Sequence, residues 1–160
     1  MAAGSDNPSL IVHATAVRLG PRAALIRGQS GSGKSDLALR CLGLARSVLA
    51  PAPMELVADD QVCLTRVGIE LLASSPAPLA GLIEVRGLGI LRVPFHAPAP
   101  VVLLVDLVVS GGVERYPDPW PTEIIMGLEL PVMRLAAFEA SAPLKLAMAL
   151  ERQPWLGDRT

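Results

Sequence analysis

Short apolar segments separated by Gly- and Pro-containing breaks dominate the chain, which predicts many short strands joined by turns. Apolar residues recur at helical spacing in only two segments, 35–42 and 144–152. The longest apolar run, 101–109, is typical of a central strand that is buried on both faces. The pattern therefore favours a strand-rich α/β domain over a doubly wound sheet in which strands and helices alternate strictly. The other predicted strands are 10–19, 23–26, 56–58, 62–66, 69–72, 122–126 and 128–135.

The residues outside these segments indicate where the chain turns, how it begins and where the last helix starts. Gly20-Pro21 and Gly68 each separate two strand segments and so predict two hairpins. Residues 1–9 are small and polar, and we expect them to be frayed. Ser141 stands where it can cap the last helix, with Pro143 in the first turn.

Composition indicates one globular domain over residues 1–160. Hydrophobic residues make up 51% of the chain and aromatic residues only 3%, so aliphatic side chains must build the core. The net charge of −1 argues against non-specific nucleic-acid or anionic-membrane binding as the main role. We see neither a bilayer-length apolar run nor a secretory signal and expect a cytoplasmic location. Cys41 and Cys63 lack metal-ligand spacing and are interpreted as small buried hydrophobic residues.

Candidate chemistry centres on the stretch 28–35, which matches the phosphate-binding pattern G-x-x-x-x-G-K-S. A predicted strand precedes it and a predicted helix follows, so the phosphates would lie at a helix N-terminus. Lys34 is expected to reach the β- and γ-phosphates, and the Ser35 hydroxyl to bind Mg²⁺. The cofactor-binding residues are therefore predicted to be Gly28, Gln29, Ser30, Gly31, Ser32, Gly33, Lys34 and Ser35.

Two adjacent carboxylates, Asp59 and Asp60, end the predicted strand 56–58. In this position one carboxylate can hold Mg²⁺ or its water, and the other can act as general base for an incoming hydroxyl. The alternative interpretation is a solvated turn.

Three further residues have two interpretations each. His13 lies in a β-prone run whose strand should run beside the strand that enters the phosphate loop; it is either a packed or surface histidine or a residue close to the phosphates. Glu84 and Arg86 stand two apart in an extended segment, so their side chains should point the same way. They suit either a metal ligand with a phosphate clamp or an ordinary ion pair.

These motifs, in this order, resemble the catalytic domain of the HPr kinase/phosphorylase family. The most specific piece is 83–90, Ile-Glu-Val-Arg-Gly-Leu-Gly-Ile, which follows the phosphate loop and the Asp pair. The resemblance covers residues 10–110 well and is looser beyond them. It implies a strand-rich P-loop kinase domain of the HPr kinase / PEP carboxykinase-like type, here without the N-terminal domain of longer members.

The resemblance implies transfer of phosphate from ATP or pyrophosphate to a serine of HPr, a phosphocarrier protein, and its removal by inorganic phosphate. It makes Asp60 the base, and Ser35, Asp59 and Glu84 the residues that bind Mg²⁺ or its water. It also implies that Lys34, His13 and Arg86 steady the transferred group, that Arg115 matches a later catalytic arginine, and that the protein is a hexamer. Kinase activity is better supported than phosphorylase activity, because 94–120 lacks the expected basic, glycine-rich loop.

Two alternative functions stay open at this point. One is a P-loop phosphotransferase that acts on a small hydroxyl-bearing molecule, which would need a mobile arginine-bearing lid. The other is a nucleotide-sensing module without turnover. The Asp pair argues against a sensor, since sensing needs no general base.

Overall fold

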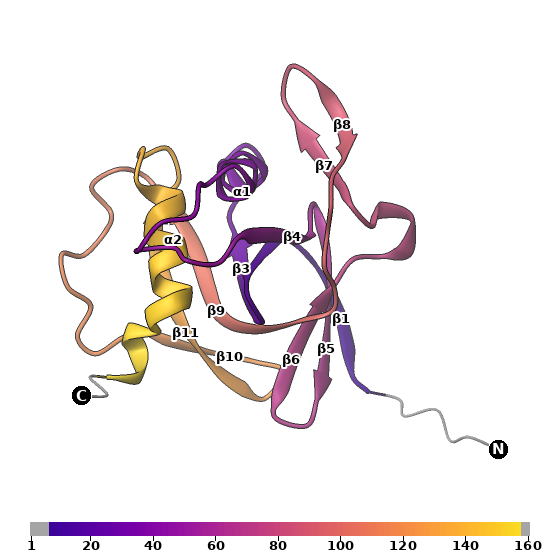
Figure 1. The fold of residues 1–160 in the computed structure, drawn as a ribbon. Helices are drawn as coiled ribbons and strands as arrows, with labels where there is room; N and C mark the ends of the chain where they lie inside the picture. Colours follow the sequence, from indigo (N-terminus) through magenta and orange to yellow (C-terminus); the bar gives the residue numbers. More distant parts are fainter. Residues whose placement is uncertain (1–6, 158–160) are drawn as a thin grey trace.

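A computed structural model describes residues 7–157, which fold into a curled nine-stranded sheet, a separate two-stranded sheet and two helices (Figure 1). The strands are β1 Ser9–His13, β2 Thr15–Leu19, β3 Arg22–Arg27, β4 Met54–Ala58, β5 Gln61–Val67, β6 Glu70–Ser74, β7 Leu82–Val85, β8 Gly89–Arg92, β9 Ala99–Val108, β10 Thr122–Ile125 and β11 Leu128–Ala136. The helices are α1 Lys34–Leu42 and α2 Ala142–Arg152, with short 3₁₀ helices at Ala77–Leu79 and Pro154–Leu156.

Strand direction brings the phosphate loop and the Asp pair to one edge of the sheet. The strand order is β1-β5-β6-β9-β3-β2-β4, and β11 pairs with both β9 and β10. β3 runs parallel to β9, whereas β2 runs antiparallel to both β3 and β4. β3 and β4 therefore end at the same edge, so the loop after β3 meets the residues after β4.

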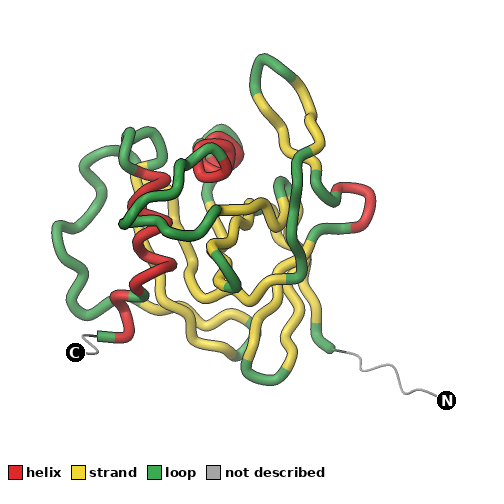
Figure 2. The backbone as a smooth tube through the Cα atoms, viewed as in Figure 1, coloured by secondary structure: helices red, strands yellow, loops and turns green. Residues whose placement is uncertain are grey.

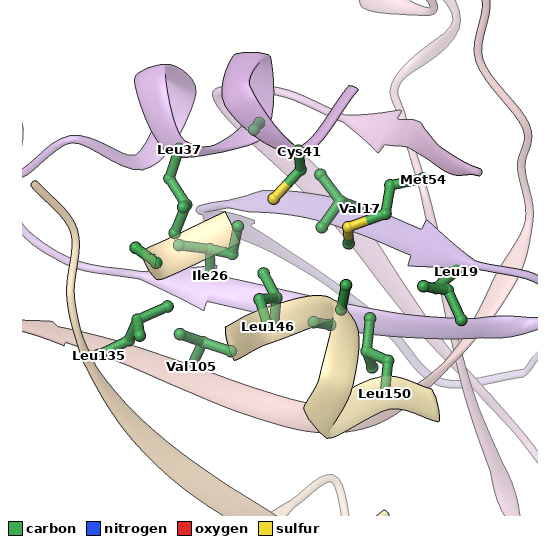
Figure 3. Packing of buried hydrophobic residues seen from close by; sticks show 14 of the residues in the cluster. Val17, Leu19, Ile26, Leu37, Cys41, Met54, Val105, Leu135, Leu146 and Leu150 are labelled. Carbon is green, nitrogen blue, oxygen red and sulfur yellow. The ribbon is translucent and has the colours of Figure 1, made fainter. Parts of the chain in front are cut away.

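The core consists of two aliphatic clusters, one on each face of the sheet. On one face, Leu37 and Cys41 of α1 and Leu146 and Leu150 of α2 pack against residues such as Ile26 (Figure 3). The second cluster lies on the other face and is built mostly from strand residues. Figure 2 shows how the strands of the sheet curl. Both helices thus cover the same face, which holds α1 and its N-terminus against the sheet.

The β7–β8 hairpin projects from the body of the molecule (Figure 1). Ile83 and Val85 of β7 are buried in the helix-side cluster, while every residue of β8 is exposed. One side of the hairpin is therefore anchored to the core and the other faces solvent.

Most of the predicted elements are confirmed. β2 and β3 form the first hairpin, β5 and β6 form the second, and β9 lies inside the sheet between β3, β6 and β11. Within residues 7–157 the α-helices are the two predicted ones.

None of the helices in the described part of the chain is long and apolar enough to cross a membrane. Both cysteines are free; Cys41 is buried, as predicted, whereas Cys63 is only partly buried.

Four local predictions are wrong. The run 10–19 is two strands divided at Ala14, because β1 leaves the hairpin and pairs with β5. Ser9 belongs to β1 and is not frayed, while residues 1–6 lie outside the described part. The Ser141 side chain does not cap α2, since its backbone is already near-helical. Arg86 lies in the turn after β7, so it does not continue the extended segment of Glu84.

Candidate active site

The phosphate loop has the local geometry that its sequence predicts. β3 ends at Arg27, and α1 begins at Lys34 after Gly33, which has a φ of 101°, a conformation that glycine adopts without strain. The Lys34 ammonium donates to the carbonyl oxygens of Gly28 at 2.7 Å and Gln29 at 2.9 Å. Lys34 is only 7% exposed, and burial lowers the pKa of its amino group. The lysine is thus already inside the loop, where the charge of a bound phosphate would offset the effect of burial on its ammonium group.

The N-terminus of α1 opens towards this loop. No side chain caps it, and the first intrahelical bond runs from the Leu37 N–H to the Gly33 carbonyl. The N–H groups at the start of a helix lack partners within the helix and carry the positive end of its dipole. They therefore suit an anion such as a phosphate.

Asp59 is buried beside the phosphate loop and ties three elements together. Its exposed fraction is 4%. The Thr15 and Ser35 hydroxyls each donate to Oδ1 at 2.8 Å, and the backbone N–H of Glu84 donates to Oδ2 at 3.1 Å. The carboxylate therefore holds the loop serine in place and joins β2, α1 and β7 at one point.

Asp60, the next residue, is exposed to solvent. Its side chain is 63% exposed, and Oδ1 lies 2.9 Å from His13 Nε2. Its φ of 69° is in the left-handed region, which Asp tolerates better than most residues. A left-handed residue directly after Asp59 turns the chain, so one carboxylate points inward and the other outward.

A pocket of about 310 Å³ lies above the phosphate loop and gathers most of the predicted site residues. The Arg86 guanidinium also approaches the loop, since an atom added at the Cβ position of Gly31 would lie 3.8 Å from it. Arg115 instead lines a second pocket, formed by the loop after β9 together with β11 and Lys145. The first pocket is lined by His13, Lys34, Ser35, Asp60, Glu84 and Arg86, among others.

His13 reaches this pocket by a route that the sequence did not indicate. We expected its strand to run beside β3, but β1 pairs with β5, and His13 lies opposite Gln61 in that register. Because Gln61 directly follows Asp60, the pairing of β1 with β5 itself brings His13 to the carboxylate.

The structure adds three residues to the site. Thr15 is fully buried and donates to Asp59, while Leu39 and Phe138 form an apolar part of the pocket wall. A polar residue inside a buried strand needs a hydrogen-bond partner, so the sequence held a weak indication that Thr15 belongs to the site. The sequence held no such indication for Phe138, which is far from the phosphate loop along the chain.

The donor set near Ser35 fits a hard divalent cation. In residues 7–157 no group of three or more His, Cys, Asp or Glu side chains is arranged to hold a metal ion. Nucleotide-bound Mg²⁺, however, keeps waters and takes phosphate oxygens besides one or two carboxylates. Asp59, Asp60 and Glu84 outnumber the cations Lys34 and Arg86, so a bound polyphosphate would need a further positive charge. The predicted ligands Ser35, Asp59 and Glu84 are thus oxygen donors of the right kind.

An ion cluster anchors the strand end that precedes the phosphate loop. Arg27 donates to the Asp106 carboxylate at 2.8 and 3.1 Å and makes two hydrogen bonds to Glu123. These bonds, Glu123 first, raise the pKa of Arg27 against the effect of burial, and they lower the pKa of Glu123. The cluster links β3, β9 and β10 at the edge where the loop begins.

The curled sheet, the phosphate loop on a helix N-terminus and the inward and outward aspartates define a P-loop domain suited to phosphoryl transfer. The chain belongs to the family described as HPr Serine kinase C-terminal domain, whose model matches residues 7–96. The resemblance seen in the sequence and the predicted fold class are thereby confirmed.

Individual relatives agree with this assignment. The chain is 38% identical over 87 residues to the HPr kinase/phosphorylase of Clostridium tetani, covering 54% of this chain and 26% of that protein. It is 46% identical over 70 residues to that of Neisseria meningitidis serogroup C, covering 43% and 19%. The match therefore spans about a quarter or less of the length of these curated relatives. The solved Hpr(Ser) kinase/phosphatase from Coxiella burnetii superposes with a TM-score of 0.73 at 27% identity, over 92% of this chain and 97% of that one.

Proposed function

We propose that this domain is a serine protein kinase that transfers the γ-phosphate of ATP to a serine hydroxyl of HPr. The names of its relatives, HPr kinase/phosphorylase and Hpr(Ser) kinase/phosphatase, support the reaction and the acceptor. The observation that carries the proposal is the contrast between the two aspartates. Asp59 is bonded to the phosphate-loop serine, whereas Asp60 is exposed in the pocket beside His13.

Each of the predicted site residues has a separate role in the proposed phosphoryl transfer. Lys34 and the N–H groups of the loop hold the phosphates, and Arg86 stabilises the charge on the transferred group. Ser35, Glu84 and Asp59 would hold Mg²⁺ or its water, and this cation would neutralise phosphate charge. Asp60 accepts the proton of the serine hydroxyl as the serine oxygen bonds to the γ-phosphorus. The bond from that phosphorus to the bridging oxygen breaks, and ADP leaves.

The same carboxyl group could serve the reverse direction. An oxygen of inorganic phosphate would attack the phosphorus of phosphoserine, protonated Asp60 would return its proton to the serine oxygen, and pyrophosphate would form. This second activity is part of the family resemblance, as is a hexameric assembly; a cytoplasmic location, expected from the sequence, completes the proposal. Light scattering on the purified protein would measure its oligomeric state.

The decisive experiment is transfer of labelled γ-phosphate from ATP and Mg²⁺ to purified HPr. Label should appear on a serine of HPr with the native chain and disappear with Lys34→Ala and with Asp60→Asn. Asp118→Asn, in the loop after β9, is the matched control and should transfer label normally. Native protein that binds ATP but leaves HPr unlabelled would refute the proposal and leave a different acceptor or a sensing role.

A further inference from the structure

An exposed aromatic side chain stands directly beside the phosphate loop. Phe138, in the turn between β11 and α2, is 73% exposed although it lines the pocket. Its ring edge touches the loop: an atom at the Cβ position of Gly33 would lie 2.9 Å from Phe138 Cζ. Such a position leaves most of the ring free while its edge is fixed against the loop.

The turn that carries Phe138 is tied to α1 on both sides of the ring. The Arg40 guanidinium donates to the carbonyl oxygens of Ala137 and Glu139, the latter at 3.3 Å. The same side chain is held by Asp36 at 2.9 Å. Arg40 therefore fixes the backbone around Phe138 to the helix that begins the phosphate site.

A second apolar side chain extends this surface along α1. Leu39, 37% exposed, also lines the pocket and stands four residues after Ser35, so both lie on one face of the helix. The pocket thus passes from the polar Ser35 to the apolar Leu39 and Phe138. An exposed apolar wall that continues a phosphate site suits the apolar part of a phosphate-bearing ligand.

We propose that Phe138, supported by Leu39, is the stacking platform for the base of the nucleotide whose phosphates the loop binds. Bases stack on aromatic rings through their π faces, and the fixed turn holds this ring ready before the nucleotide arrives. This inference rests on the proposed function, because it takes the loop's ligand to be a nucleoside triphosphate.

The test compares a ligand that has a base with one that has none. Calorimetry would measure the dissociation constants of ATP and of inorganic triphosphate, both with Mg²⁺, for native protein, Phe138→Ala and Phe138→Trp. Phe138→Ala should weaken ATP binding about 10-fold and leave triphosphate binding within about twofold. Phe138→Trp should bind both ligands like the native chain. Tyr116→Ala, which removes another exposed aromatic side chain away from the pocket, is the matched control.

Each outcome decides the proposal. If the ratio of the two dissociation constants changes less than threefold in Phe138→Ala, Phe138 is no base platform. Equal weakening of both ligands would likewise overturn it, because the residue would then act on the loop. Unchanged triphosphate binding shows that the variant is folded. Transfer of label to HPr with no selective loss in Phe138→Ala refutes the inference alone, and a selective loss without transfer to HPr refutes the proposed function alone.

Discussion

The pocket has two regions that differ in how firmly they are held. The phosphate-binding region, residues 28–36 with Asp59, is tied by internal hydrogen bonds, and Lys34 and Asp59 are at most 7% exposed. The pocket rim, defined by His13, Asp60, Glu84 and Arg86, is open, with the first two side chains 55% and 63% exposed.

This difference follows from what each region would have to admit. A phosphate is small and charged, so preorganised donors such as the buried Lys34 ammonium bind it with little rearrangement. A serine on the surface of a protein can reach the phosphate only if the groups that receive it are exposed. Substitutions at the rim should therefore affect kcat, whereas substitutions in the phosphate-binding region should affect the affinity for ATP.

The largest effect is expected at the rim. Asp60→Asn keeps the shape and tolerates the left-handed backbone, but it cannot accept a proton. We expect kcat for HPr phosphorylation to fall about 10³-fold, the range of general-base catalysis, with the KM for ATP little changed. Initial-rate kinetics measure both. A fall in kcat below about tenfold would mean that another group takes the proton.

In the phosphate-binding region, Lys34→Met should act on affinity. Loss of a charged donor to phosphate should weaken ATP binding about 100-fold in calorimetry. Arg46→Met, an exposed position, is the control for removing a cationic side chain. Unchanged ATP affinity in Lys34→Met would contradict the role of the loop.

A smaller effect is expected for His13→Gln, which retains a hydrogen-bonding group next to Asp60 but cannot become charged. We expect kcat to fall about tenfold and ATP affinity to stay the same. The other histidine, His96, is 58% exposed and outside the pocket, so His96→Gln is a matched control. Equal kinetics for the two variants would remove His13 from the site.

The smallest effect concerns stability at the strand end that leads into the loop. Glu123→Gln loses the ion pair with Arg27, which is partly exposed, and should lower the free energy of unfolding by about 0.5–1 kcal/mol at pH 7. Because the pair lowers the folded-state pKa of Glu123, its contribution is present above the unfolded pKa of about 4.3 and disappears as pH falls through the folded value. Urea titrations at pH 7 and pH 3 should show the difference shrink. Glu70→Gln, on an exposed position, should show no such trend.

The sequence predicted those parts of the structure that depend on short stretches of the chain. The phosphate loop and the Asp pair lie within short stretches whose residue types impose their own backbone geometry, and the structure brings these stretches together. Hydrophobic patterning likewise predicted β9 and both helices, because each buries a continuous apolar surface. The roles of the gathered residues stay predictions.

The sequence patterns did not predict contacts between segments that are far apart along the chain. The pairing of β1 with β5, which brings His13 to Asp60, joins strands almost 50 residues apart. Phe138 reaches the phosphate loop because Arg40 of α1 holds the turn between β11 and α2, almost 100 residues further along the chain. Arg115 lies in a loop without regular structure, and the structure places it at the second pocket, so its catalytic role stays a prediction that this geometry does not support.

The anchoring of the β7–β8 hairpin has a consequence for local unfolding. Glu84 and Arg86 stand on or next to β7, whose partner β8 pairs with no other strand in the described chain and has all its side chains exposed. β8 can therefore separate without disrupting the core, and its amide hydrogens should exchange with solvent much faster than those of β9. The turn that carries Arg86 would then loosen at a cost well below that of global unfolding, while the buried Ile83 and Val85 keep β7 in place.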